Sequence, residues 1–256
     1  GTFTVILIAT NQDGEGNSDT IQDFVQVLAV NQKSIEFDGV NDRVEIQNAS
    51  NALLTAPKFD YSFSGWIKSP TLAQSGIFFA FNNDNDDAPR SRIWRQPSGV
   101  IAVDFRDNSG GGGFFASPNA IDDNKWTHIA LTKSGSDFTL FIDSIEMISQ
   151  SIVFGAFTFN LITLGAQVDS GSNFYFPGLM DEVAIYDKAL SQSEIAGVYN
   201  AGSPPDLLEQ SISSNLLMHL RMGDDASFPV IPDASGNGND GTLKNMTTSS
   251  IVGDTP

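Results

Sequence analysis

The sequence predicts an all-β protein built as an antiparallel sandwich. Short strand-like runs recur between residues 33 and 202, and clusters of Asn, Asp, Ser and Gly separate them. Hydrophobic residues make up 40% of the chain and include 19 Phe, which is enough to fill a sizeable core. Many short strands joined by polar turns are typical of β-sandwiches.

Composition and charge limit the classes of function. The formal net charge is −18, with 13 basic and 31 acidic residues, and 24 of the acids are Asp. Because such a surface repels phosphate backbones, we expect no nucleic-acid binding. Two interpretations of the acids stay open: they keep a β-protein soluble, or they supply oxygen ligands to divalent cations.

Cysteine and long apolar runs are both missing from the sequence. The chain has no Cys, which excludes disulfides, thiolate metal sites and cysteine nucleophiles. No run reaches the roughly 18 apolar residues that a membrane helix needs, so we expect no membrane partner. The sequence starts at Gly1 inside a strand-like run, which suggests a processed product or a fragment.

Residues 1–32 form the first predicted segment. A strand with apolar alternation at Phe3, Val5 and Leu7 is followed by a polar stretch and a second strand around Val25 and Val27. Two strands alone are marginally stable, so they need another surface to pack on. The segment resembles the closing hairpin of a PKD-like, immunoglobulin-type module.

Residues 33–202 form the predicted sandwich itself. A helix is expected at 191–199, because Ser191 and Glu194 have the spacing of a capping box. Trp66 and Trp126 supply large apolar surfaces, and we expect both in the space between the sheets rather than as sugar platforms. The expected strand runs lie at 34–46, 61–68, 76–81, 99–105, 112–117, 126–133, 137–143 and 176–186.

Residues 203–256 form the third segment. Ser203-Pro204-Pro205 is a plausible linker, and the aliphatic run at 215–225 predicts another strand. The Gly- and Asn-rich stretch at 234–246 then predicts a hairpin. The expected fold therefore has strand extensions at both ends of the sandwich.

Five motifs in the central segment resemble the laminin-G-like, concanavalin A-like jelly-roll modules. They are FDGVNDRVEI at 37–46, YSFSGWIKS at 61–69, KWTHIALTKSGSDFTLFID at 125–143, LITLGA at 161–166 and FPGLMDEVAIYDKALSQSEIAGVYNAG at 176–202. They occur in family order within a stretch of about 170 residues. The resemblance implies an antiparallel jelly-roll β-sandwich.

The C-terminal segment carries a further resemblance. LLMHLRMGDDASFPVIPDASGNGNDGTLKNM at 216–246 is similar to the stretch that normally precedes F-D-G in the same family, and here it follows the module. It also resembles the endings of structural proteins from tailed bacteriophages. We therefore expect an extracellular or virion-surface location. The C-terminal strands either return to this sandwich as an edge or pass by strand exchange to a neighbouring subunit, and the N-terminal hairpin joins a partner chain or an upstream domain. The expected partners are other copies of the chain or virion or surface proteins.

Catalysis is not expected, although a sandwich hydrolase acting on glycans is the alternative. Related glucanases place three carboxylates on one strand as E-x-D-x-x-E. Asp143 and Glu146 have the spacing of the last two, but Phe141 occupies the nucleophile position. The two histidines, His128 and His219, have no recognisable nucleophile motif nearby.

The resemblance also implies calcium at the rim of the sandwich. One candidate site is the turn that contains Asp84, Asp86 and Asp87, and the other pairs Asp38 with Asp181. For the turn, the alternative is an ordinary solvated loop. For Asp38 and Asp181, the alternative is that each carboxylate caps a turn.

A candidate ligand site surrounds Trp94. Arg92 and Arg95 flank this residue and break the acidic background of the sequence. Phe114 and Phe115 form a second candidate aromatic patch. For each, the alternative is burial or a protein–protein contact. The expected function is a non-catalytic structural or recognition module for assembly, glycan adhesion or both.

Overall fold

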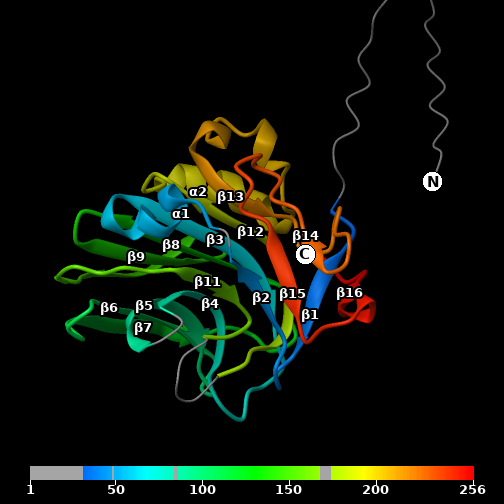
Figure 1. Cartoon of the computed structure of the whole chain (residues 1–256), viewed down its shortest axis with the longest axis horizontal. Coiled ribbons are helices and arrows are strands. Elements are labelled where there is room, and N and C mark those ends of the chain that lie inside the picture. Colours follow the sequence, from blue (N-terminus) through cyan, green and yellow to red (C-terminus); the bar gives the residue numbers. More distant parts are fainter. Residues whose placement is uncertain (1–30, 48, 84–85, 168–173) are drawn as a thin grey trace, which may run out of the picture.

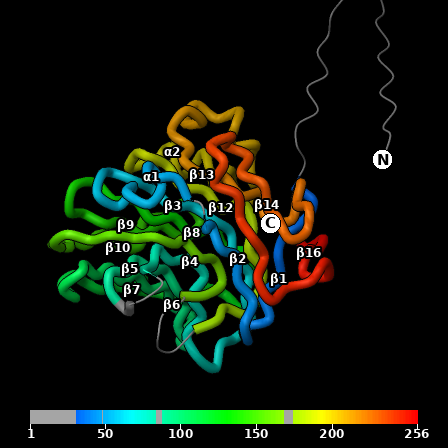
Figure 2. Tube along the Cα trace, viewed as in Figure 1, coloured from blue at the N-terminus to red at the C-terminus, as the bar shows by residue number. Residues whose placement is uncertain are grey.

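A computed structural model describes residues 31–47, 49–83, 86–167 and 174–256. Its chain folds as two antiparallel sheets packed face to face, with few helices (Figures 1 and 2). The predicted all-β jelly-roll sandwich is confirmed. The predicted hairpin of residues 1–32 lies almost entirely outside the described residues.

Sheet A has eight strands within the part of the chain that the structure describes. β12 is its longest member and pairs with β3 on one side and with both β1 and β13 on the other. In spatial order the strands are β10 (Ile145–Ser151), β9 (Asp137–Ile142), β8 (Thr127–Ser134), β3 (Tyr61–Lys68), β12 (Pro177–Tyr186), β1 (Ser34–Asp38) and β16 (Ile251–Val252), with β13 (Leu216–Leu220) beside β12.

Sheet B also has eight strands in the described residues, and its outer face carries Trp94 and Arg92. In spatial order they are β14 (Val230–Ile231), β15 (Gly241–Lys244), β2 (Arg43–Ile46), β11 (Leu161–Leu164), β4 (Gly76–Asn83), β5 (Asp86–Arg95), β6 (Val100–Arg106) and β7 (Gly112–Ala120).

The core between the sheets is rich in phenylalanine. Phe63 of β3 and Phe79 of β4 join the two sheets with ring centroids 4.3 Å apart. Phe105 of β6 contacts Phe138 of β9 at 5.7 Å. Such close ring packing explains why the sequence holds so many Phe, because each buries a large apolar area at a modest cost in side-chain entropy.

The helices are short and lie outside the sandwich. The capping box predicted for α2 (Gln192–Tyr199) is confirmed: Ser191 Oγ accepts from the Glu194 amide, and Glu194 Oε2 accepts from the Ser191 amide. The others are α1 (Asn51–Thr55) and the single-turn η1 (Ala56–Lys58), η2 (Asn200–Gly202), η3 (Leu207–Glu209), η4 (Ser213–Asn215) and η5 (Thr248–Ser250).

The segment at 187–215 covers the outer face of sheet A. Ile195 and Val198 of α2 are buried against Phe141 and Tyr186, which point outward from β9 and β12. Trp66 is buried as predicted, but it is on this outer face, where it stacks on Tyr199 of α2 at 5.6 Å. The prediction that it lies between the sheets was wrong.

Trp126 also lies elsewhere than predicted. It is only partly buried, and its indole Nε1 donates to Asp254 Oδ1 near the C-terminus (2.8 Å). Asp254 also binds Lys68 Nζ (2.5 Å) and, through its carbonyl, Ser34 Oγ (2.6 Å). Trp126 therefore holds down the end of the chain instead of filling the core.

The C-terminal segment returns to the same sandwich, the first of its two expected destinations. β13 pairs with β12, β15 pairs with β2, and β16 pairs with β1. In Figure 2 the red end of the chain accordingly lies beside the blue β1. The strands at 216–252 thus complete the edges of both sheets.

Candidate functional site

The outer face of sheet B is defined by strand alternation. Ile93 of β5 and Val103 of β6 belong to the core between the sheets, so their neighbours Trp94 and Ala102 point the other way. Trp94 and Ala102 form a separate apolar cluster with Ile77 and Ala80 of β4. The register places Arg92 on this same face, opposite Asp104.

A pocket opens on this face where β4 begins and β5 ends. It has a volume of about 170 Å³ and is lined by Ser75, Ile77, Arg92, Trp94 and Phe174. Enclosed sites for drug-sized ligands usually measure about 300–1,000 Å³, so this pocket would hold one ring of a larger ligand.

The aromatic residues at the pocket differ in exposure. Trp94 is only 8% exposed, whereas Phe114 of β7 is 54% exposed. The two ring centroids lie 5.6 Å apart. Trp94 therefore forms part of the floor, and Phe114 offers an accessible aromatic surface beside it.

Three contacts with described residues hold Arg92 in place. Its guanidinium lies 4.9 Å from the centre of the Trp94 ring. Its Nη1 donates to Gln167 Oε1 (2.7 Å), and its Nη2 pairs with Asp104 Oδ2 (3.1 Å). A planar cation fixed over an indole in this way keeps both groups in one orientation at the pocket.

Asp104 joins three arginines. Besides Arg92, it pairs with Arg90 Nε (2.7 Å) and Arg106 Nε (3.3 Å). Its side chain is 2% exposed, and that of Arg106 is 44% exposed. The cluster of cations therefore reaches from the pocket toward solvent at Arg106.

Arg95, the third residue of the predicted ligand site, lies apart from Arg92 and Trp94. It is 2% exposed, and its Nη1 donates to the Pro70 carbonyl (2.5 Å). Its Nη2 pairs with Asp123 in the loop after β7. The structure thus brings Arg92 and Trp94 together, whereas Arg95 ties two loops at the rim.

The predicted metal ligands are not brought together in the described part of the chain. Asp38 lies opposite Pro177, four residues before Asp181 on β12. Its Oδ1 accepts from the backbone amides of Val40 (2.8 Å) and Asn41 (3.2 Å), which is the turn-capping alternative. Asp84 and the side chains of Asp86 and Asp87 lie outside the described residues.

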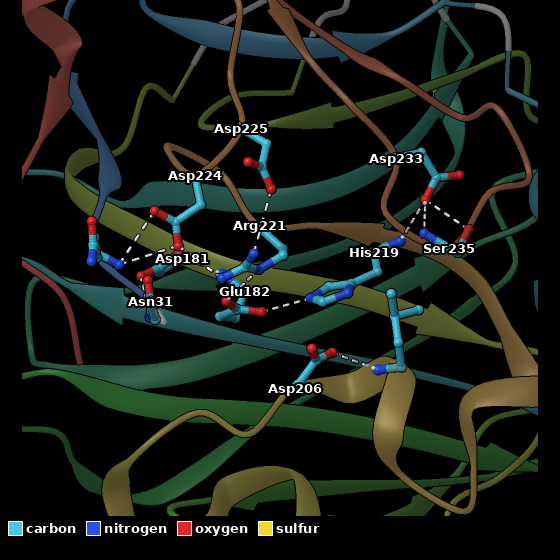
Figure 3. Close-up of polar contacts among 12 residues, drawn as sticks. Asn31, Asp181, Glu182, Asp206, His219, Arg221, Asp224, Asp225, Asp233 and Ser235 are labelled. Carbon is cyan, nitrogen blue, oxygen red and sulfur yellow. Dashed lines mark hydrogen bonds and ion pairs between the residues drawn. The ribbon is translucent and has the colours of Figure 1, made fainter. Parts of the chain in front are cut away.

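Asp181 lies instead in a buried polar cluster at a bulge of β12, shown in Figure 3. It is fully buried; its Oδ2 accepts from Asn31 Nδ2 (2.9 Å) and its Oδ1 from the Glu182 amide (2.9 Å). Burial, and then the neighbouring Glu182 charge, raise the pKa of Asp181 well above its ordinary value.

The C-terminal segment supplies the cation of this cluster. Arg221 pairs with Asp224 (3.0 Å) and approaches Glu182 (3.5 Å), and His219 Nε2 contacts Glu182 Oε2 at 2.6 Å (Figure 3). Asp224 in turn accepts from the Gln32 amide (3.1 Å). These contacts fasten the residues before β1 to the residues after β13.

The cluster offers carboxylate oxygens, which are the kind of atom that calcium binds. Calcium takes six to eight oxygen ligands, and the Asp181 and Asp224 oxygens already accept hydrogen bonds. Over residues 31–47, 49–83, 86–167 and 174–256, no group of three or more acidic, histidine or cysteine side chains could hold a metal ion. Calcium at the rim of the sandwich therefore stays a prediction.

The glucanase-like carboxylates lie at the edge of sheet A. Asp143 and Ser144 form the two-residue turn between β9 and β10, both with positive φ, as the hairpin interpretation expects. Asp143 Oδ1 accepts from the His128 amide (2.9 Å), and Glu146 is an exposed residue of the edge strand. Phe141 is 4% exposed beneath the α2 cover.

Sequence comparison assigns the family. A model for the concanavalin A-like lectin/glucanases superfamily, Laminin_G_3, matches residues 38–196, which is more than half of the chain. The chain belongs to this superfamily. The matched stretch contains nearly all of the five sequence motifs, from Asp38 to the first residues of α2. A search of curated protein sequences found no match.

Solved structures share the superfamily fold at low sequence identity. A putative carbohydrate binding protein from Bacteroides ovatus has a TM-score of 0.59 and 14% identity, over 87% of this chain and 60% of that one. The CBM40 of the Ruminococcus gnavus IT-sialidase, bound to α2,3-sialyllactose, has a TM-score of 0.52 and 14% identity, over 67% and 100%. The NanB sialidase from Streptococcus pneumoniae has a TM-score of 0.53 and 18% identity, over 66% and 28%.

The fraction of each solved structure that this chain covers limits what the similarity shows. The chain covers 60% of the Bacteroides protein and only 28% of the sialidase. At such identities the comparison shows the fold alone.

None of the helices in the described ranges has the length and apolar character needed to span a bilayer.

Sequence reasoning missed several residues at the pocket. Ser75, Phe174 and Gln167 lie in or beside loops, so nothing local pointed to them. Asp104 did give a signal, because it is a charged residue inside the otherwise apolar run VIAVDF. An acid inside a strand is expected to find a cationic partner, and Arg92 on the preceding strand is one such partner.

Proposed function

We propose that this chain is a non-catalytic glycan-binding module whose ligand lies on the outer face of sheet B. The pocket between Trp94 and Phe174, with exposed Phe114 beside it, is the observation that carries the proposal. It combines an aromatic surface with polar groups on a surface reachable from solvent.

This combination suits the chemistry of sugars. A pyranose presents one apolar C–H face, which packs on aromatic rings, and a rim of hydroxyls, which need hydrogen-bond partners. Phe114 and Phe174 supply rings, and Ser75 and Arg92 supply polar groups. The volume fits one sugar ring, so neighbouring units of a glycan would extend over the open sheet.

Two of the similar structures support a glycan as the ligand class. One is named as a putative carbohydrate binding protein, and another is a CBM40 bound to α2,3-sialyllactose. The sialidase match spans 28% of that enzyme, so it lends no support to catalysis by this chain. Phe141, at the position of the glucanase nucleophile, supports a binding role.

The finer expectations remain part of the proposal. An extracellular or virion-surface setting fits a glycan ligand and an acidic chain without cysteine, and it rests on the phage-like C-terminal motif at 216–246. Self-association is the corresponding proposal for partners. Light scattering of the full chain tests it, and a monomer at all concentrations would count against it.

A pair of phenylalanine substitutions tests the glycan site. Phe114→Ala removes the exposed ring beside the pocket, and Phe59→Ala removes a ring that is 68% exposed near α1. On a glycan array, we expect Phe114→Ala to lose about tenfold or more in affinity for bound glycans while Phe59→Ala matches the wild type. Equal binding by all three proteins would remove the outer face of sheet B as the site.

A further inference from the structure

Cations gather on the outer face of sheet B, against the charge of the whole chain. Strand register places Glu45 and Thr163 in the same row as Ala80 and Arg92, so Arg43 and Lys244 share this face. Arg90 and Arg106 lie in the next row beyond Arg92 and Asp104. The five cations on this face are Arg43, Arg90, Arg92, Arg106 and Lys244.

Few carboxylates of the described residues oppose these cations. Glu45 pairs with Arg43 (2.7 Å) and Lys244 (3.7 Å), and Asp104 pairs with the three remaining arginines. Among the described residues, Glu45 and Asp104 are thus the carboxylates that pair with these five cations. This face thus gathers five of the 13 basic residues of a chain whose net charge is −18.

One of these cations lines the pocket, and an ion cluster joins it to a second one that is exposed. Arg92 lines the pocket itself, and Asp104 connects it to Arg106, whose side chain is 44% exposed. Phe114 is directly opposite Asp104 on β7, so the exposed ring adjoins this ion cluster. A sugar packed on Phe114 would thus have guanidinium groups beside its rim.

We infer that the site prefers glycans carrying an anionic substituent, a carboxylate or a sulfate. This inference rests on the proposed glycan-binding function and specifies its ligand class. Guanidinium groups donate paired hydrogen bonds to planar oxyanions, and such charge-assisted bonds are about twice as strong as neutral ones. In this arrangement the exposed Arg106 binds the anionic group, and Arg92 binds the part of the glycan that lies in the pocket.

The net charge makes the inference easy to test. A protein of charge −18 repels polyanions in general, so retention of an anionic glycan requires a local positive site. The probes are two matched pairs: α2,3-sialyllactose against lactose for the carboxylate, and dextran sulfate against dextran for the sulfate. Titration calorimetry serves the first pair and affinity electrophoresis the second.

The variants isolate one cation. Arg106→Gln removes the exposed guanidinium and leaves Asp104 paired with Arg90 and Arg92, so the fold is expected to persist. We expect it to lose about tenfold in affinity for the anionic member of a pair, about 1.4 kcal/mol, with little change for the neutral one. Arg106→Lys should recover part of the loss, and raised salt should mimic it.

Lys125→Ala is the matched control. It removes one cation whose side chain is 64% exposed in the loop before β8, and it changes the net charge by the same amount. It should bind both members of each pair as the wild type does. Equal affinity for anionic and neutral members, or an equal loss for both in Arg106→Gln, would overturn the inference. No binding of any probe would instead contradict the proposed function.

Discussion

The two outer faces of this sandwich differ in their exposure to solvent: one is covered by the chain itself and the other is open. Sheet A is closed by the segment at 187–215, so that Ala184, Ala130 and Phe141 pack under α2. Sheet B keeps Phe114 and Arg106 in contact with solvent. In one protein, therefore, the same kind of surface is a second core on one side and a solvent-exposed face, the proposed binding face, on the other.

The comparison teaches where polar groups are tolerated. On the closed face, His128 is fully buried between Trp66 (5.2 Å) and Tyr199 (5.9 Å). Neither of its ring nitrogens has a hydrogen-bond partner within the described part of the chain. On the open face, by contrast, each arginine has at least one carboxylate partner. Burial without partners makes the closed face the more fragile one in acid.

The largest expected effect is therefore an acid sensitivity of the closed face. Burial lowers the pKa of His128 from 6.5 to about 3. Between those values the unfolded chain binds a proton that the folded chain does not, so stability falls as pH falls from 6.5 toward 3. At about 1.4 kcal/mol per pH unit the loss approaches 5 kcal/mol.

Urea unfolding at pH 7 and pH 4 measures this loss, with His128→Phe as the comparison. The variant should show a smaller loss of unfolding free energy between the two pH values than the wild type. The same pH dependence in both proteins would show that His128 does not carry the effect.

The next largest effect is the difference in stability lost when a side chain is truncated on the covered face or on the open face. Ile195 is fully buried under the α2 cover, and Ile195→Ala should reduce the unfolding free energy by about 3 kcal/mol, as is usual for large-to-small core changes. Phe114→Ala, on the open face, should change it by less than about 0.5 kcal/mol. Similar losses in the two variants would contradict the distinction between a covered and an open face.

A smaller effect concerns the buried acid at the end of the covered face. Because the pKa of Asp181 is raised, its folded form holds a proton more tightly than its unfolded form, so its ionisation costs stability as pH rises through that pKa. Asp181→Asn should therefore raise the melting temperature at neutral pH in EDTA, and the gain should vanish in acid.

The same variant decides the calcium prediction. If calcium binds near Asp181, millimolar calcium should stabilise the wild type, by about 2.7 kcal/mol at a hundredfold excess over Kd, and not the variant. A wild-type melting temperature that is equal in EDTA and in calcium would count against calcium at any of the predicted positions.

Local signals in the sequence explain what could be predicted. The strand runs and the capping box at Ser191 depend on residues close in the chain, and the structure contains both. The family motifs carried the jelly-roll fold. Trp94 and Arg92 could be singled out because they break the acidic background, and they do meet at one pocket.

Two properties that no local motif encodes explain what could not be predicted: the face of the strand to which a side chain points, and the register between paired strands. The side chains of neighbouring residues in a strand point to opposite faces, so Trp66 could be assigned to the wrong face and Arg95 to the wrong site. The pairing of Asp38 with Pro177 depends on the register between β1 and β12, which no local motif encodes. Phe174 and Ser75 meet only after distant loops converge.

The pairing of β16 with β1 has a mechanical consequence. Ser34 lies opposite Val252 and Ile35 opposite Ile251, so the start of β1 and the end of β16 are at the same end of this antiparallel pair. A force drawn between Lys33 and Gly253 would open the pair like a zipper, one residue at a time, instead of shearing it. The link between Asp254 and Lys68 would then yield at low tension, before the long strands of sheet A carry any load.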